Sequence, residues 1–381
     1  HIFFDQAGNH IVGGNDYVHG DTAVFTQNGR GGNGVRNLGV GHRYLKAIVA
    51  ENGTLIAEGE RFSFEAQLIC SEIDLDKLRM ERRGNTTFAT AQADLYPKAF
   101  HIHTAPITER ENVLTRHFAQ LPFVPQGKEL DKHCNEVFNI QSMALAKRLT
   151  HIRCSKVVIG ISGGLDSTLA LLATVRTFDL LQLPRTGIIG VTMPGFGTTD
   201  RTYQNALDLM RHLGVSLREI SIKDACIQHF KDIEHDISVH DTTYENSQAR
   251  ERTQLLMDVA NRENAIVIGT GDLSELALGW ATYNGDHMSM YGMNAGIPKT
   301  LVRHLVQWEA QNNYEDEVRD ILLDIVNTPI SPELIPAKAD GTIKQKTEDL
   351  VGPYELHDFF IYHFLRSGYR PKKIYYLACL T

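Results

Sequence analysis

Residues 156–168 read Lys-Val-Val-Ile-Gly-Ile-Ser-Gly-Gly-Leu-Asp-Ser-Thr, and this stretch decides the fold. Residues 156–161 form an apolar run of strand length, and residues 165–178 have helical character. The two glycines between them let the backbone take positive φ and approach a ligand closely. The following helix offers free N–H groups and the positive end of its dipole, which favour a phosphate. The stretch therefore predicts a phosphate-binding loop between a buried strand and its helix.

This loop matches neither of two common phosphate-binding motifs. The lysine that follows the second glycine of a Walker A sequence is missing, and so is the three-glycine pattern of a dinucleotide fingerprint. Asp166 cannot contact a phosphate directly, because like charges repel, so a Mg²⁺ ion between the two explains the carboxylate. The alternative without a ligand is a plain helix N-terminus capped by Ser162. Two glycines, two serines and an aspartate directly after a strand favour the phosphate loop.

Further strand-like and helical segments alternate along the chain. We expect strands at 156–161, 186–193, 216–222 and 265–269, and helices at 134–149, 165–178, 200–213 and 247–262. Strands that are apolar at every position are buried on both faces. The pattern predicts an α/β fold, a doubly wound parallel sheet with helices on both faces.

The first part of the chain has a different character. Asn-Gly at 52–53 separates the apolar runs 47–50 and 54–57, which predicts a β-hairpin. Residues 67–73 resemble a further strand, so this region reads as β-rich. Residues 97–132 contain four prolines without a steady period and read as a linker. Residues 1–45 are dense in turn formers and remain unassigned.

The composition excludes several classes of protein. The chain has 381 residues and a net charge of -8, whereas a duplex-binding protein needs a basic face, so no nucleic acid partner is expected. Five cysteines without a C-x-x-C pair argue against a zinc ribbon or a disulfide framework and favour the cytoplasm. No apolar run approaches the roughly 20 residues that span a bilayer, so no membrane is expected. The missing initiator Met and the abrupt end suggest a fragment.

The phosphate loop resembles that of the N-type ATP pyrophosphatases, which reads Ser-Gly-Gly-x-Asp-Ser. The resemblance implies that the loop holds the β- and γ-phosphates of ATP and that ATP is split between its α- and β-phosphates. The group includes GMP synthetase, asparagine synthetase, argininosuccinate synthetase, tRNA-thiolating enzymes and NAD synthetase. The loop alone does not choose among them.

Three later segments narrow the choice. Residues 191–202, 244–254 and 269–286 resemble glutamine-dependent NAD synthetase, and the likeness runs from about Cys134 to the end of the chain. GMP and asparagine synthetases fit these segments less well. A tRNA-thiolating enzyme is disfavoured by the lack of paired cysteines and by the acidic charge. Another N-type amidotransferase, or an inactive nucleotide-binding fragment, remains as the alternative.

The resemblance implies roles for individual residues. Asp166 and Lys299 are the catalytic candidates, and Asp166 and Glu275 the Mg²⁺ ligands. The implied ATP site comprises Gly160, Ile161, Ser162, Gly163, Gly164, Leu165, Asp166, Ser167, Met193, Thr270 and Lys299. The implied site for nicotinic acid adenine dinucleotide (deamido-NAD) comprises Asn246, Arg250, Glu275, Trp280, Ala281, Thr282 and Tyr283.

The chemistry of these side chains suits the roles, although structural alternatives exist. The fork of Arg250 suits a pyrophosphate or a carboxylate, and the flat ring of Tyr283 suits stacking on a nicotinate. Without a ligand, Trp280 would be a core residue, Arg250 and Arg252 would form part of a solvated helix face, and Glu275 would be an ordinary first-turn acid. Asp286 fits a turn or a substrate contact equally well.

The implied reaction is the ATP-dependent amidation of deamido-NAD to NAD through an acyl-adenylate, with release of AMP and pyrophosphate. Full-length members take ammonia from glutamine through a nitrilase-like domain, whose end residues 46–90 resemble. No counterpart of its nucleophilic cysteine is found, and Cys70 reads as a small buried hydrophobe. We expect a partial nitrilase-like domain at 1–96, a linker at 97–132 and the synthetase domain at 133–381. Free ammonia would be the nitrogen source, and the resemblance also implies a homo-oligomer and a C-terminal tail beyond Thr381.

Overall fold

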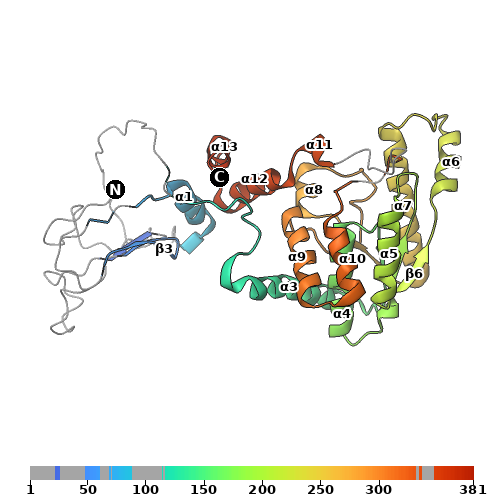
Figure 1. The fold of residues 1–381 in the computed structure, drawn as a ribbon, viewed down its shortest axis with the longest axis horizontal. Coiled ribbons are helices and arrows are strands. Elements are labelled where there is room, and N and C mark those ends of the chain that lie inside the picture. The colour runs from blue at the N-terminus through green and yellow to red at the C-terminus, as the bar shows by residue number, and fades with distance from the viewer. Residues whose placement is uncertain are drawn as a thin grey trace. The chain divides into compact units, whose positions relative to one another are not determined.

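The computed structural model describes residues 22–25, 48–60, 68–69, 71–87, 114, 116–331, 334–336 and 347–381. Cys70, the first part of the predicted linker and most of residues 1–45 lie outside this set. The chain divides into two compact units, one comprising His1–Ala119 with Tyr362–Thr381 and the other Gln120–Ile361. Each unit has its own sheet, with strand order β1-β2-β3 in the first and β6-β5-β4-β7-β8 in the second (Figure 1).

The sheet of the larger unit is parallel throughout. Its strands are β4 (Val157–Gly160), β5 (Ile188–Thr192), β6 (Ser216–Glu219), β7 (Ile266–Gly269) and β8 (Tyr291–Gly292). From β4 the chain adds β5 and β6 on one side and β7 and β8 on the other. The order therefore reverses beside β4, and such switch points are where open α/β sheets bind ligands.

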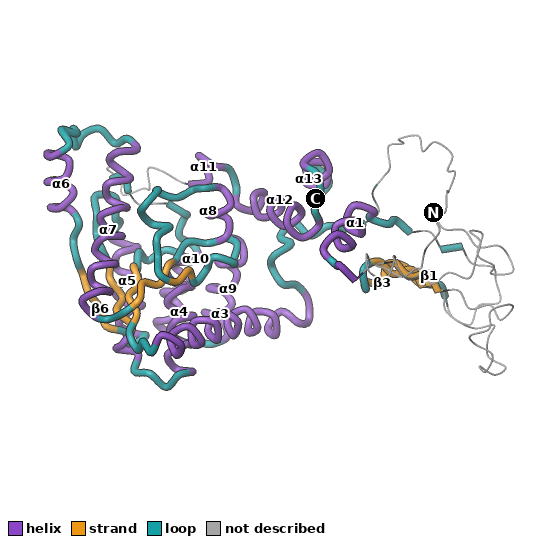
Figure 2. The backbone as a smooth tube through the Cα atoms, turned by 180° about the vertical axis from the view of Figure 1, so that it is seen from behind, coloured by secondary structure: helices purple, strands orange, loops and turns teal. Residues whose placement is uncertain are grey.

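Helices cover both faces of this sheet, as predicted (Figure 1, Figure 2). One face carries α3 (Leu130–Ile152), α4 (Leu165–Leu180), α5 (Asp200–His212), α9 (Lys299–Asn312) and α10 (Asp316–Val326). The other face carries α6 (Lys223–Asp232) and α7 (Thr242–Glu263). Val157 and Ile159 of β4 point into the first core and Val158 into the second. Burial on both faces explains why the strands show no apolar–polar alternation.

Two helices are longer than the sequence pattern predicts. α3 begins at Leu130, inside the predicted linker, and ends at Ile152, followed by the C-cap Arg153 with a left-handed φ of 54°. α7 begins at Thr242 rather than at 247, because the side chain of Asp241 caps it and accepts from the amide of Tyr244. Its first turn is too polar to show an apolar period. The remaining short helices of this unit are η2 (Gly127–Glu129), η3 (Arg185–Gly187), α8 (Leu273–Leu278) and α11 (Thr347–Val351), and α12 (Tyr354–Ser367) follows them.

The smaller unit contains an antiparallel sheet of β1 (Thr22–Phe25), β2 (Ile48–Glu51) and β3 (Thr54–Glu58). The predicted hairpin is confirmed, with φ of 47° at Asn52 and 75° at Gly53, as a two-residue turn of this type requires. The strand predicted at 67–73 is wrong for its described part, since residues 68–69 and 71–73 are irregular. They lead into α1 (Leu75–Gly84), and α13 (Pro371–Ala378) belongs to the same unit.

Buried charges hold this unit together. Glu51 is fully buried and accepts two hydrogen bonds from Arg116, at 2.9 and 3.1 Å. Asp74 caps α1 and also accepts from Lys373 at 2.6 Å and from the hydroxyl of Tyr369. The bond between Asp74 and Lys373 ties the start of α1 to α13.

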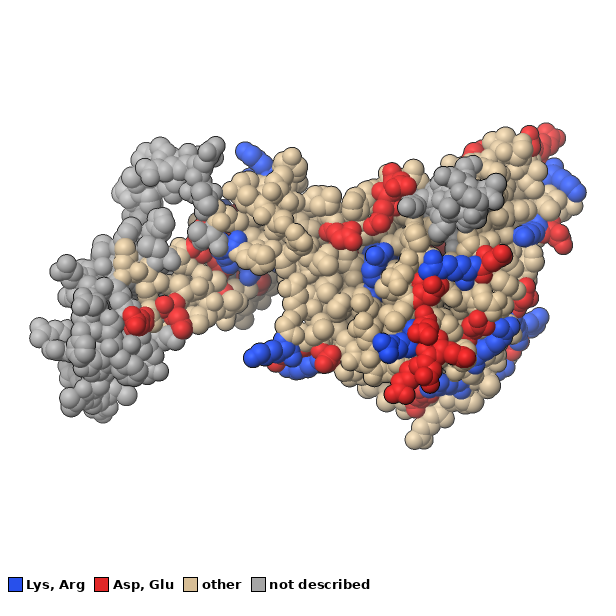
Figure 3. All heavy atoms as spheres, viewed as in Figure 1, with Lys and Arg blue, Asp and Glu red and all other residues tan. Residues whose placement is uncertain are grey.

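The surface of the described chain mixes both signs of charge. On the face drawn in Figure 3, Lys and Arg side chains are interspersed with Asp and Glu over the larger unit. Within the described residues, no helix combines the length and the apolar character that crossing a membrane demands.

Candidate active site

The glycine-rich loop lies between β4 and α4, at the switch point of the sheet. Gly163 has a φ of +85°, and a Cβ there would lie 2.1 Å from the carbonyl oxygen of Thr202, so only glycine fits. The loop's serines brace it: the Ser167 hydroxyl accepts from the amide of Ser162 at 3.3 Å and donates to the carbonyl of Gly164 at 3.1 Å. No side chain caps α4 at Gly164. The helix N-terminus therefore faces the loop with its dipole available to an anion.

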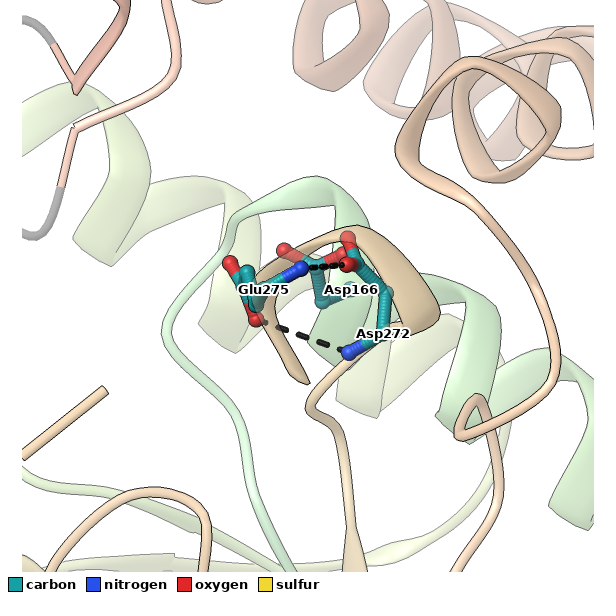
Figure 4. A group of neighbouring side chains, drawn as sticks. All are labelled: Asp166, Asp272 and Glu275. Atoms are coloured by element: carbon teal, nitrogen blue, oxygen red, sulfur yellow. Dashed lines mark hydrogen bonds between the residues drawn. The ribbon is translucent and has the colours of Figure 1, made fainter. Parts of the chain in front are cut away.

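Three carboxylates meet beside this loop (Figure 4). Asp166 lies in the first turn of α4, whereas Asp272 is the N-cap of α8 and Glu275 lies in the first turn of α8. One oxygen of each lies within 4.8 Å of the others. Asp272 and Glu275 also form a capping box, in which Asp272 accepts from the Glu275 amide at 2.8 Å. Glu275 is thus both the first-turn acid of the structural alternative and a member of the cluster.

Lys299, the first residue of α9, places its ammonium among the three carboxylates. Its Nζ lies 2.6 Å from Asp166 and 2.8 Å from both Asp272 and Glu275, and the side chain is 2% exposed. Burial alone would lower the pKa of Lys299, but the three carboxylates outweigh it and hold that pKa well above its ordinary value. The cluster still has more negative than positive charge.

Two of the three carboxyl groups, those of Asp272 and Glu275, have raised pKa values. Burial, followed by the charge of Asp166, raises the pKa of Asp272 to about 8. The same two causes raise the pKa of Glu275. Within the described residues, Asp166 Oδ1 is buried and has no hydrogen-bond partner. Clustered carboxylate oxygens with a spare ligand atom are the donor set that Mg²⁺ prefers, so the residues present fit a divalent cation.

A cavity of about 280 Å³ opens over the loop and the cluster. Most of the predicted ATP-site residues line it: Gly160, Ile161, Ser162, Gly164, Leu165, Asp166, Ser167, Met193 and Thr270. Gly163 and Lys299 are not among its lining residues. Arg252 lines the cavity and donates to the carbonyl of Met193 at 3.2 Å, so the solvated-face alternative is wrong for this residue.

The predicted deamido-NAD residues lie outside this cavity, except Glu275. Asn246 accepts from the Thr282 hydroxyl at 2.8 Å, and Arg250 donates to the carbonyl of Tyr283 at 3.1 Å, so α7 holds the loop after α8. Arg250 also lines a second hollow of about 520 Å³. Trp280 is half-buried rather than a core residue, Ala281 is exposed and the Tyr283 side chain is 82% exposed.

Asp272 and Asn294 escape sequence reasoning, whereas the sequence predicts Asp286 as a turn residue or a substrate contact. Asp286 accepts from the Thr282 amide at 2.7 Å, as a turn residue does, and also lines the first cavity. Asn294 is fully buried and donates to the carbonyls of Asp166 and Thr270, which joins the phosphate loop to β7's loop. The Asp-x-x-Glu spacing at 272–275 indicates a capping box and could have identified Asp272. No local pattern marks Asn294.

The fold and the site together define a doubly wound α/β protein with a glycine-rich loop and a carboxylate–lysine cluster at its switch point. Residues 137–362 match the family model for NAD synthase, which is more than half of the chain. The chain therefore belongs to the NAD synthase family.

Individual relatives agree with this assignment. Glutamine-dependent NAD(+) synthetase of Mycobacterium leprae (strain TN) is 42% identical over 345 residues, which cover 87% of this chain and 50% of the relative. The enzyme of the same name from Thermotoga maritima is 30% identical over 330 residues, 86% of this chain and 52% of the relative. The chain thus spans about half the length of these relatives.

A solved structure shares the fold. NMN synthetase from Francisella tularensis superposes with a TM-score of 0.51 at 23% identity, over 65% of this chain and 93% of that one. This likeness concerns the arrangement of the α/β unit alone.

Proposed function

We propose that this chain carries the synthetase site that amidates deamido-NAD to NAD while ATP is split into AMP and pyrophosphate. The observation that carries the proposal is the buried Lys299 ammonium, held by three carboxylates directly beside the glycine-rich loop. Membership of the NAD synthase family supports the choice of reaction.

In this proposal the loop and its neighbours bind ATP. The backbone amides of residues 162–167 and the hydroxyls of Ser162 and Ser167 hold the β- and γ-phosphates at the N-terminus of α4. Thr270 contacts the phosphates and Met193 lies beside the adenine; both residues line the same cavity. Asp166 and Glu275 would hold Mg²⁺, with Asp272 as a third carboxylate beside them. The bound ion would neutralise phosphate charge, as in phosphoryl transfers generally.

The chemistry needs positioning and charge neutralisation rather than a covalent enzyme intermediate. An oxygen of the nicotinate carboxylate attacks the α-phosphorus, the bond to the β-phosphate oxygen breaks, and pyrophosphate leaves towards the loop. Lys299 stabilises the negative charge on that leaving group. Ammonia then attacks the acyl carbon, loses a proton, and AMP leaves with the electron pair of the former acyl–oxygen bond.

The second substrate would lie along α7 and the loop after α8. Arg250 and Asn246 hold the dinucleotide, and Trp280 with the segment 281–283 contacts its nicotinate end. The exposed ring of Tyr283 and the adjoining hollow support this placement.

Three further points belong to the proposal. In the proposal, residues 1–96 belong to a nitrilase-like domain, 97–132 form a linker and 133–381 form the synthetase domain, and ammonia is the nitrogen nucleophile at the site. The chain forms a homo-oligomer, which is supported by the large exposed apolar side chains of Ile140 and Met143 on α3. Light scattering of the purified chain tests the oligomer.

The test measures pyrophosphate and AMP release with Mg-ATP, deamido-NAD and either ammonium or glutamine. We expect release with ammonium, none with glutamine, and loss of release in Asp166→Asn. Nicotinic acid mononucleotide replaces deamido-NAD in a parallel assay, because the structural relative is an NMN synthetase. Faster release with the mononucleotide would assign the smaller substrate. Binding of ATP without release under any condition would leave an inactive nucleotide-binding fragment.

A further inference from the structure

The helix that carries Lys299 begins without a cap of its own. The residue before α9 is Pro298, whose side chain makes no capping hydrogen bond. The first amides of a helix have no partner within the helix and need one from elsewhere. Here the amide of Lys299 donates to the Ser274 hydroxyl at 2.9 Å, and the amide of Thr300 donates to Asp358 at 2.8 Å.

Asp358, on α12, organises both of these contacts. It is fully buried and accepts from the hydroxyl of Ser274, from the amide of Thr300 and from the Thr300 hydroxyl at 2.6 Å. The Ser274 hydroxyl therefore donates to Asp358 while it accepts from the amide of Lys299. Within the described residues, no Lys, Arg or His lies in ion-pair distance of Asp358. Its charge is stabilised by these hydrogen bonds and by the N-terminal dipole of α9.

The residues that Asp358 holds are sequence neighbours of the ammonium–carboxylate cluster. Thr300 follows Lys299, and Ser274 lies between Asp272 and Glu275. One buried carboxylate thus fixes the start of α9 against the start of α8. The Tyr354 ring, one turn earlier on α12, lies 5.3 Å from the Lys299 Nζ and covers it. The position of the Lys299 ammonium depends on α12 through both residues.

We propose that Asp358 is a positioning residue for the synthetase reaction. It joins α8, α9 and α12 so that Lys299 meets the carboxylates and the phosphate loop in one geometry. The proposal rests on the function proposed above, in which Lys299 neutralises the leaving pyrophosphate. Displacement of a catalytic group by about 1 Å costs roughly 100-fold in rate, so loosening the start of α9 should lower kcat.

The main variant is Asp358→Asn. It keeps the shape of the side chain but leaves one acceptor oxygen where the carboxylate has two. The matched control is Glu309→Gln on α9, the helix that Asp358 contacts. There a buried carboxylate pairs with Arg176 at 2.6 Å, well along the helix from Lys299. Both variants lose a buried charge from contact with α9, so both should unfold at a lower temperature. We expect kcat to fall about 10- to 100-fold in Asp358→Asn, with the KM for ATP changed less than about threefold, and to stay at wild-type level in Glu309→Gln.

Hydrogen exchange provides a readout that does not need turnover. The amides of Lys299 and Thr300 should exchange faster in Asp358→Asn than in the wild type, and at the wild-type rate in Glu309→Gln. If Asp358→Asn does not fold, Thr300→Val removes only one of the three hydrogen bonds to Asp358 and should show the same two effects in weaker form.

Three outcomes decide the matter. Wild-type kcat in a folded Asp358→Asn, or an equal loss of kcat in Glu309→Gln, would overturn the positioning role. A fall confined to Asp358→Asn together with faster amide exchange would uphold it. If the wild-type chain releases no pyrophosphate with any substrate, the proposed function fails. In that case, unchanged amide exchange in Asp358→Asn would also overturn the role of Asp358. Faster exchange of the Lys299 and Thr300 amides would show that Asp358 still fixes the start of α9.

Discussion

At the scale of single residues, two adjacent glycines of the phosphate loop have different constraints. A Cβ on Gly163 would lie 2.1 Å from a backbone oxygen at a left-handed φ, whereas a Cβ on Gly164 would meet nothing nearer than 3.4 Å. Gly163→Ala should therefore lower the free energy of unfolding by at least ~2 kcal/mol, and Gly164→Ala by less than ~1 kcal/mol. Denaturant unfolding without nucleotide measures both. Equal losses would contradict the assignment of the strained position to Gly163.

Lys299 gives a second prediction at this scale. Lys299→Met leaves three carboxylates within 4.8 Å of one another and should cost about 3–5 kcal/mol of stability. Mg²⁺ should raise the unfolding temperature of this variant more than that of the wild type, because a bound cation replaces the lost charge. The control is Lys156→Met, since Lys156 pairs with Glu263 at the surface with 47% of its side chain exposed, and should cost under ~1 kcal/mol. If Lys299→Met loses no more stability than Lys156→Met, the three carboxylates do not depend on the charge of Lys299.

The sequence predicts the loop but only part of the cluster. Gly163, Gly164 and Asp166 are contiguous, so their chemistry is visible locally. Asp358 contacts Ser274 across 84 residues of chain, and no periodic pattern encodes such a contact. Asp272 is hidden for another reason, because a carboxylate at a helix cap has an ordinary structural explanation.

At the scale of elements, the apolar pattern predicts the order of strands and helices better than their ends. The strand predicted at 186–193 is shorter because residues 185–187 form a 3₁₀ turn. The strand predicted at 67–73 is wrong because an apolar run of that length also suits an irregular extended segment. This segment leads to Asp74, which caps α1.

Helix α7 gives a prediction at this scale through Gln248. This side chain is fully buried, accepts from the amide of Phe196 at 3.2 Å and donates to the carbonyl of Leu334 at 2.9 Å. Leu334 lines the nucleotide cavity, so Gln248 links that wall to α7. Gln248→Leu should cost about 2–3 kcal/mol and raise the KM for ATP several-fold, because both backbone groups lose their partner.

Two variants sharpen the test of Gln248. Gln248→Glu keeps an acceptor for Phe196 but turns a buried carboxylate oxygen towards the carbonyl of Leu334. Its KM for ATP should therefore rise, and its loss of stability should be at least as large as that of Gln248→Leu. Gln204→Leu makes the same change at an exposed position of α5 and should leave both quantities unchanged. Unchanged ATP affinity in Gln248→Leu would show that the cavity wall does not depend on this link.

At the scale of the whole molecule, strand order explains why the site lies beside β4. The sequence predicts a parallel sheet from runs such as 157–160, yet nothing local states that β4 lies between β5 and β7. That order is a tertiary property, fixed by which helices pack on each face. The resemblance to a known family, rather than the periodicity, identified the substrate expected at this edge.

The smaller unit offers a test of stability against pH. His363 is 5% exposed and stacks on Tyr369, with ring centroids 5.5 Å apart. Burial lowers its pKa to about 4 from an ordinary 6.5; Asp74 opposes this shift and Lys373 adds to it. Between these pH values the unfolded chain binds the proton and the folded chain does not. Stability is therefore complete above about pH 6.5 and decreases as the pH falls towards 4, by ~3 kcal/mol in total.

Hydrogen exchange of residues 362–378 at pH 7 and at pH 4.5 measures this loss where it occurs. The Asp74 carboxyl has a pKa below its ordinary 3.8, because hydrogen bonds from Lys373 and Tyr369 outweigh the opposing effect of burial, so its own contribution is lost only at lower pH. His363→Phe keeps an aromatic ring without a titrating group and should remove the dependence between pH 6.5 and 4.5. His117→Gln changes an exposed histidine of the same unit and should keep it. If the stability of His363→Phe still depends fully on pH, another group of the unit causes the loss. If the dependence disappears in His363→Phe but not in His117→Gln, the buried neutral imidazole of His363 sets the acid stability of α12 and α13.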